Sequence, residues 1–241
     1  MDSIYLDNAA TTPVLPEVVY KMKEVLSASF GNPSSIHSQG RTAKSLIENT
    51  RKSIAKELGA LPNEIIFTSG GTEGDNMVLQ GAVRGLGVET IITSKIEHRA
   101  VIHAVKNLEQ SDDINVHYVK VSSDGSPDLA ELERLLQHDD SKKLVSLMHV
   151  NNELGTICDL REIGSLCRKN DALFHSDTVQ SIGHYRLNLQ ELPIDFAVAA
   201  AHKFHGPKGV GFMYISENVT IKPLIRGGGQ ERNMRAGTEN I

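Results

Sequence analysis

Two short segments carry residue types that can do covalent chemistry on an amine. Asp177 ends a short apolar run, and Lys203 follows a second apolar run 26 residues later. A lysine amine can form a Schiff base with an aldehyde, and a nearby carboxylate can hold a proton on a ring nitrogen, which is what pyridoxal phosphate requires. Two ordinary alternatives remain: Asp177 caps a helix, and Lys203 extends from a strand end into solvent.

A glycine-rich turn offers a place for a phosphate. Ser69-Gly70-Gly71-Thr72-Glu73 directly follows the apolar segment EIIFT. Glycines let backbone N–H groups approach an anion, and a helix that starts there adds the positive end of its dipole. The Gly-Lys-Ser/Thr ending of a nucleotide P-loop is absent. The alternative is a plain strand-to-helix turn capped by Thr72.

Two further polar clusters follow apolar segments, Glu97-His98-Arg99-Ala100 and His149-Val150-Asn151-Asn152-Glu153. Either cluster alone is typical of local hydrogen bonding. Because four apolar segments each end in such a cluster, we expect the clusters to meet at one edge of a sheet and to form one site.

The elements that must position these residues alternate along the chain. Short apolar segments separated by amphipathic ones predict an α/β fold, with a mostly parallel sheet covered by helices on both faces. Ligands of such sheets collect beyond the carboxyl ends of the strands. The predicted strands are 64–68, 90–94, 116–121, 144–150, 173–176, 196–200 and 211–215, and the predicted helices are 17–27, 42–58, 99–109, 129–137 and 160–169, with one more after the glycine turn.

Composition narrows the function classes. The chain has 241 residues, of which 39% are hydrophobic and 23% are charged, so we expect a folded domain. Its net charge is −5, so we do not expect it to bind nucleic acid. Cys158 and Cys167 form no disulfide framework and no common metal pair, so we expect a reducing compartment and no metal site. We see no signal peptide and no membrane-spanning run, and expect a cytoplasmic protein or one from an organelle matrix.

The motifs together resemble the cysteine desulfurases, of the class V aminotransferase group of fold type I pyridoxal phosphate enzymes. The resemblance runs in order over nearly the whole chain, through YLDNAATT, FGNPSSIH, FTSGGTE, EHRA, MHVNNE, HSDTVQ, HKFHGPKG and RAGTEN. It implies an N-terminal arm over residues 1–15 and a cofactor-binding large domain over residues 16–241.

The resemblance implies roles around the cofactor ring. Lys203 resembles the Schiff-base lysine, and Asp177 the carboxylate on the pyridine nitrogen. Gln180 resembles the amide bound to the phenolic oxygen, and His98 the histidine that stacks on the ring and moves protons. Asn152 resembles the asparagine near the ring oxygen and the substrate carboxylate.

The resemblance also implies contacts to the phosphate. Gly71 and Thr72 match the phosphate-binding turn, and His202 matches a second contact. Thr238 resembles the threonine that reaches across a homodimer to the other subunit's phosphate.

The implied reaction removes sulfur from free L-cysteine, giving alanine and a persulfide on a protein cysteine for iron–sulfur cluster assembly or tRNA thiolation. A homodimer and a sulfur-acceptor scaffold protein are the implied partners. The family continues beyond the position of Ile241 with a small domain, the nucleophilic cysteine loop and a substrate-binding arginine. A chain without these is expected to lack turnover, because neither Cys158 nor Cys167 matches the nucleophile.

Several positions depart from the family pattern. Ala200 stands where a serine usually donates to the phosphate, a loss of roughly 1.5–3 kcal/mol in cofactor binding. Thr178 replaces an alanine expected under the ring, and Gly71 and Gly74 are expected to loosen the phosphate turn. We therefore expect weaker cofactor binding than is typical. The alternatives are a non-catalytic partner-binding or degenerate protein, and a selenocysteine lyase or another class V enzyme.

Overall fold

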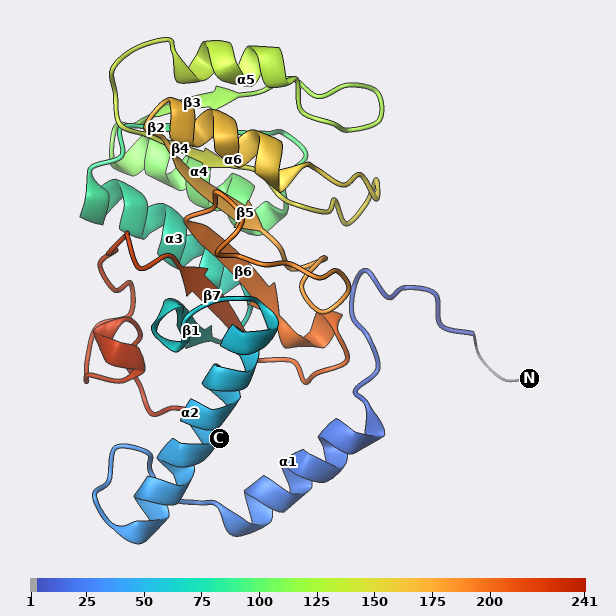
Figure 1. The fold of residues 1–241 in the computed structure, drawn as a ribbon, viewed down its shortest axis with the longest axis vertical. Coiled ribbons are helices and arrows are strands. Elements are labelled where there is room, and N and C mark those ends of the chain that lie inside the picture. The colour runs from blue at the N-terminus through green and yellow to red at the C-terminus, as the bar shows by residue number, and fades with distance from the viewer. Residues whose placement is uncertain (1–3) are drawn as a thin grey trace.

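Alternating apolar and amphipathic segments build the sheet and its helices in the computed structural model, which describes residues 4–241 (Figure 1). The strands are β1 Ile65–Thr68, β2 Thr90–Thr93, β3 Asn115–Tyr118, β4 Lys143–Ser146, β5 Leu173–Asp177, β6 Phe196–Ala200 and β7 Gly211–Ile215. The helices are α1 Pro16–Ala28, α2 Ser38–Glu57, α3 Gly71–Leu86, α4 Arg99–Ser111, α5 Leu129–Leu136 and α6 Leu160–Lys169, and short 3-10 turns lie at Pro62–Glu64, Ala201–Lys203 and Glu231–Asn233.

Within residues 4–241 the strands form one seven-stranded sheet in the order β1-β7-β6-β5-β4-β2-β3. β7 runs antiparallel to both of its neighbours, and the other pairs are parallel. The carboxyl ends of β1, β2, β4, β5 and β6 therefore point to the same edge. The predicted α/β fold with a mostly parallel sheet is confirmed.

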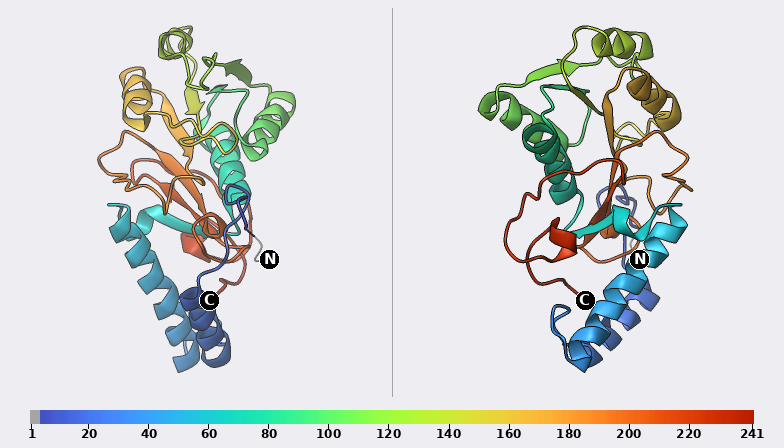
Figure 2. Two further views of the ribbon diagram at one scale, coloured as in Figure 1. Left: turned by 90° about the vertical axis from the view of Figure 1, so that its right-hand side faces the viewer. Right: turned by 60° about the vertical axis from the view of Figure 1, so that its left-hand side comes forward.

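Two apolar cores lie on opposite faces of the sheet, and Figure 2 shows helices on both sides. One core packs α3 and α4 against the sheet, through side chains such as Met77 and Val101. The other packs α5, α6 and the end of α2, through side chains such as Leu132 and Ile163. Strands buried on both faces read as continuous apolar runs, and β6 with its sequence FAVAA is one of them.

The N-terminal arm and α1 lie apart from these cores. In the described part of the chain no α1 residue is buried, although Val19, Tyr20 and Leu26 are apolar and exposed. Figure 1 shows α1 and α2 extending from one end of the sheet, with the C-terminus beside α2. Among residues 4–241, no helix is both long enough and apolar enough to cross a membrane.

Two predicted strands are shorter than expected. The strand predicted at 116–121 ends at Tyr118. The prediction of strand 144–150 is wrong in its second half, because β4 ends at Ser146. The β2 strand stops pairing at the same level, and the Glu97 carboxylate beyond it accepts the N–H of Met148 at 2.9 Å. A side chain thus takes the place of a β2 partner at Met148, while the N–H groups of Leu147 and His149 still donate to the β5 carbonyls of His175 and Asp177.

Candidate functional site

One cavity lies at the carboxyl edge of the sheet. Its volume is about 270 Å³, and residues after β1, β2, β4, β5 and β6 line it together with the N-terminal arm. Eight of the nine residues predicted for the site line it: Gly71, Thr72, His98, Asn152, Asp177, Gln180, His202 and Lys203. The exception is Thr238, which lines a different cavity described below.

Asp177 is the last residue of β5 and forms part of the cavity floor. Its side chain is 5% exposed, and Oδ1 accepts the N–H of Val179 at 2.9 Å. Burial, aided by the charge of Asp75, raises the pKa of this carboxyl above its usual range, while His175 and His98 act in the opposite direction. A cationic group in the cavity would favour the charged form of Asp177.

Lys203 meets the N-terminal arm. Its Nζ donates to the carbonyl oxygens of Ala9 at 2.5 Å and Ala10 at 3.0 Å, and Gln180 Nε2 donates to the same Ala9 oxygen at 2.8 Å. Partial burial lowers the pKa of the lysine amine below its usual value, and the nearby carboxylates of Asp177 and Asp7 oppose that shift. The arm thus closes the cavity on the side of the lysine.

The turn that carries the lysine is fixed by Thr12 of the arm. Thr12 Oγ1 donates to the His202 carbonyl at 3.0 Å and accepts the His205 N–H at 2.7 Å. His202 Nδ1 also lies 3.1 Å from Thr11 Oγ1. The sequence contains the YLDNAATT motif but shows no role for it. Hydrogen bonds between residues 190 or more positions apart show that this motif fixes the turn that carries Lys203.

The glycine turn leaves helix N–H groups free to bind an anion. Gly70 has φ of 153°, and no side chain of residues 4–241 caps the start of α3 there. A Cβ at Gly70 would meet nothing within 4 Å, so the space before the turn is open. Glu73 does not occupy it, because its carboxylate binds Arg235 at 3.0 Å and the Ser69 N–H at 3.0 Å. This arrangement suits a phosphate.

Two expectations about this region are wrong. Gly71 and Gly74 do not loosen the turn but let α3 approach the sheet, because a Cβ on them would lie 2.7 Å from Val179 Cγ2 and 2.6 Å from Val198 Cγ1. Thr178 does not face the cavity. It is fully buried, and its Oγ1 donates to the Val198 carbonyl at 2.8 Å. Val179 lines the cavity instead.

His98 and Asn152 reach the cavity from loops. His98 caps α4, and its Nδ1 accepts the Ala100 N–H at 3.2 Å, so the proton of the neutral imidazole is on Nε2. Of the asparagine pair, Asn151 is buried and structural, with Nδ2 donating to the Ile96 carbonyl at 2.8 Å. Asn152 is the one whose side chain lines the cavity.

Sequence reasoning missed Asp75, Met148, Val179 and Ala10, which also line the cavity. Asp75 lies in the second turn of α3 and is 1% exposed. In the sequence it reads as an ordinary polar helix residue. An aspartate among GTEGDNMVLQGAV, a segment otherwise rich in small and apolar residues, was the available signal.

Neither cysteine lies on the cavity. Burial raises the pKa of the Cys158 thiol to about 11, and burial also raises that of Cys167, which packs from α6 into the core. The thiolate is the nucleophilic form of cysteine, so both side chains are poorly suited to attack sulfur.

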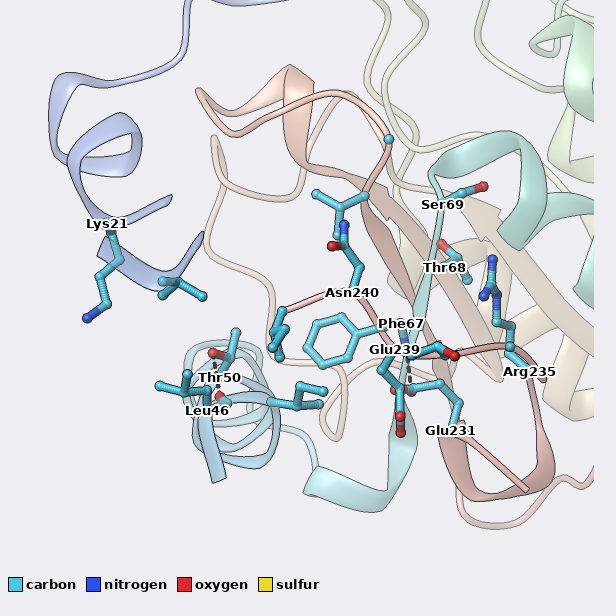
Figure 3. Close-up of a pocket in the computed structure, with 17 residues that line it drawn as sticks. Lys21, Leu46, Thr50, Phe67, Thr68, Ser69, Glu231, Arg235, Glu239 and Asn240 are labelled. Carbon is cyan, nitrogen blue, oxygen red and sulfur yellow. Dashed lines mark hydrogen bonds between the residues drawn. The ribbon is translucent and has the colours of Figure 1, made fainter. Parts of the chain in front are cut away.

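A second cavity of about 320 Å³ lies between α2, β1 and the C-terminal segment (Figure 3). Apolar side chains including Leu46, Ile47 and Phe67 line it, and Arg235 and Glu239 are among its polar residues. Thr238 belongs to this cavity. Within one chain the structure therefore does not bring Thr238 to the other eight predicted residues.

Comparisons with known proteins agree with this geometry. The model of the family "Aminotransferase class-V" matches residues 4–241. A cysteine desulfurase IscS of Dictyoglomus turgidum is 47% identical over 240 residues, which cover 99% of this chain and 60% of the relative. A solved NifS-like protein superposes with a TM-score of 0.94 at 44% identity, covering 98% of this chain and 65% of the other. A structure described as SspA in complex with cysteine superposes with a TM-score of 0.93 at 36% identity, covering 98% and 69%.

Proposed function

Because the chain belongs to the aminotransferase class-V family, we propose that residues 16–241 form the pyridoxal phosphate domain of a cysteine desulfurase. The chain spans about 60% of the length of the curated relatives it matches. The observation that carries the proposal is that Lys203 and Asp177, which come from different strand ends, face one cavity with a glycine turn beside them.

The cavity fits this cofactor in three respects. The uncapped start of α3 and the open space at Gly70 suit its phosphate. The buried Asp177 carboxylate lacks a paired lysine or arginine among residues 4–241, and a protonated ring nitrogen would supply the cation. Gln180 and Asn152 offer amide groups for the ring substituents. When bound, the cofactor supplies an electron sink for the substrate's α-carbon.

With the cofactor bound, individual residues of this chain would have separate roles. Lys203 would hold the cofactor through Nζ and, once released, take the α-proton, which the lowered pKa of this amine favours. Asp177 would hold the proton on the ring nitrogen. His98 would present Nε2–H to the substrate side, since its Nδ1 is bound to the Ala100 amide. Gly71, Thr72 and His202 would bind the phosphate, without a hydroxyl at position 200.

We take L-cysteine as the substrate, with alanine and a protein persulfide as products. The names of the relatives support this choice, as does the SspA structure that is described with cysteine. We do not assign the persulfide-forming thiol to Cys158 or Cys167, because burial raises the pKa of both thiols and neither residue lines the cavity. A homodimer is part of the proposal. It is supported by the position of Thr238 outside its own chain's cofactor cavity, since the family resemblance assigns this residue to the phosphate of a second copy. A sulfur-acceptor scaffold is the expected protein partner.

The test adds pyridoxal phosphate to the purified chain, records the absorbance spectrum, reduces the mixture with borohydride and maps the modified lysine. We expect a shifted band and a label on Lys203, and Lys203→Ala should remove both. Lys208→Ala is the matched control, because it removes a lysine from the same turn that does not line the cavity. A folded chain that shows no band, or a label on surface lysines in both variants alike, would contradict the proposal.

A further inference from the structure

Asp75 has no role in the proposed chemistry, yet it is buried beside residues that have one. It projects from α3 toward β5, and its Oδ1 is inaccessible and has no hydrogen-bond partner among residues 4–241. Burying an unpaired carboxylate costs several kcal/mol, so such a group is normally neutral or shares a proton.

The atom facing Asp75 Oδ1 is also unpartnered. His175 Nε2 lies 3.4 Å away, His175 is fully buried, and no other described group bonds to this nitrogen. On the opposite side of the ring, Nδ1 lies 2.9 Å from Ser146 Oγ, which can donate or accept. A proton between Asp75 Oδ1 and His175 Nε2 satisfies both unpartnered atoms. The couple is neutral when His175 Nδ1 carries a second proton and donates it to Ser146 Oγ.

The couple lies directly beside the residue proposed to hold the ring nitrogen. Asp75, His98 and Asp177 each place one side-chain atom within 4.8 Å of the others. His175 and Asp177 are two residues apart on β5, so both point to the α3 face of the sheet. Two carboxylates this close do not both ionise readily, as in other carboxylate pairs.

We infer that Asp75 is a positioning residue that holds one proton jointly with His175, so that the couple is neutral and Asp177 is the charged carboxylate facing the cofactor ring. The inference rests on the proposed function for its second half and on geometry alone for its first half. The charged and titratable groups around the couple are Asp177 and His175 from β5, Glu97 and His98 before α4, and Lys203 after β6. Of these, Glu97 is already bonded to Ser94 and the Met148 N–H.

The way in which stability depends on pH follows from the direction in which burial shifts the pKa of Asp75. Burial raises the pKa of Asp75 to about 8, far above its value in an unfolded chain. The folded state therefore binds a proton that the unfolded state has released, so the contribution of Asp75 to stability falls as the pH rises from about 4 to about 8. Asp75→Asn keeps the shape and removes this titration, so the variant gains stability relative to the wild type as the pH rises.

The first experiment measures the melting temperature of the wild type and of Asp75→Asn, without cofactor, from pH 5 to pH 8. We expect the variant's melting temperature minus that of the wild type to increase by at least about 5 °C over this range. A difference constant to within about 1 °C would overturn the inference. Asp75→Ser, which also removes the acid, replaces the Asn variant if that variant does not fold.

The second experiment titrates both chains with pyridoxal phosphate from pH 7 to pH 9. The ratio of their dissociation constants should change at least about threefold as the wild-type couple loses its proton, and a constant ratio would overturn the role of Asp75 at the cofactor. If the melting temperatures diverge while neither chain binds the cofactor, the proton couple stands and the proposed function fails. The two results therefore separate the inference from its premise.

Discussion

The two cavities of this molecule are built on opposite principles. The cavity at the sheet edge collects polar side chains from five strand ends, and its floor holds buried carboxylates. The surface of the cavity beside α2 is mostly apolar, although polar side chains such as Arg235 and Glu239 also line it, and one of its walls is the C-terminal segment (Figure 3). In the cavity at the sheet edge, the rigid sheet holds the polar groups in place. The cavity beside α2 depends instead on how the C-terminal segment is attached.

That attachment is a buried ion pair. Arg51 of α2 is 1% exposed and forms two bonds to Glu231 at 2.8 and 2.9 Å, and it also donates to the Ile65 carbonyl at 2.6 Å. Glu231 in turn accepts the N–H of Phe67 at 2.9 Å. Three successive residues from Glu231 to Asn233 have positive φ, which non-glycine residues rarely adopt. The ion pair therefore holds a strained turn against α2 and β1.

The largest effect should come from breaking this pair. Arg51→Ala leaves the Glu231 charge buried and unpaired, so the free energy of unfolding should fall by about 3–5 kcal/mol. Arg232→Ala is the matched control, because Arg232 is exposed and its bond to Glu48 should contribute about 0–1 kcal/mol. Chemical denaturation measures both. Equal losses in the two variants would show that the apolar cavity does not depend on this attachment.

A smaller effect is expected where α3 meets the polar cavity. Gly71→Ala places a Cβ against Val179, and the overpacking should cost about 1–3 kcal/mol and weaken cofactor binding. Val179→Ala in the same chain removes the clashing methyl groups. The double variant should therefore recover most of the loss, as a double-mutant cycle of the four chains would show. Additive losses would contradict direct contact between the two positions.

The smallest effect is expected at Thr238, which belongs to the apolar cavity in one chain. Thr238→Ala should leave cofactor affinity unchanged within about twofold at dilute chain concentration, because its side chain does not line the cofactor cavity. At chain concentrations where two copies associate, the variant should bind pyridoxal phosphate more weakly than the wild type does, if Thr238 contacts the phosphate bound to the second copy. Fluorescence titration at two chain concentrations distinguishes these cases, and a loss that is independent of concentration would contradict the proposed arrangement.

Much of the fold follows from local patterns. The strands at 196–200 and 211–215 and the helix at 160–169 have the bounds that apolar periodicity predicts. The end of β4 does not, because the Glu97 carboxylate that takes the Met148 N–H comes from a distant loop. Eight of the nine predicted site residues line one cavity, because parallel strands deliver their following residues to a common edge.

By itself, the sequence determined the order of the elements, the edge at which the polar clusters meet and the family to which the motifs point. Periodicity and motif spacing are local properties, so they can be read without coordinates. Only the tertiary structure decided which side chains are buried against one another. It put Val179 rather than Thr178 on the cavity, separated Thr238 from that cavity, and placed Asp75 opposite His175 with no other partner among the described residues. These outcomes depend on how α3 and the C-terminal segment pack on the sheet, and contacts between residues distant in sequence leave no periodic signal.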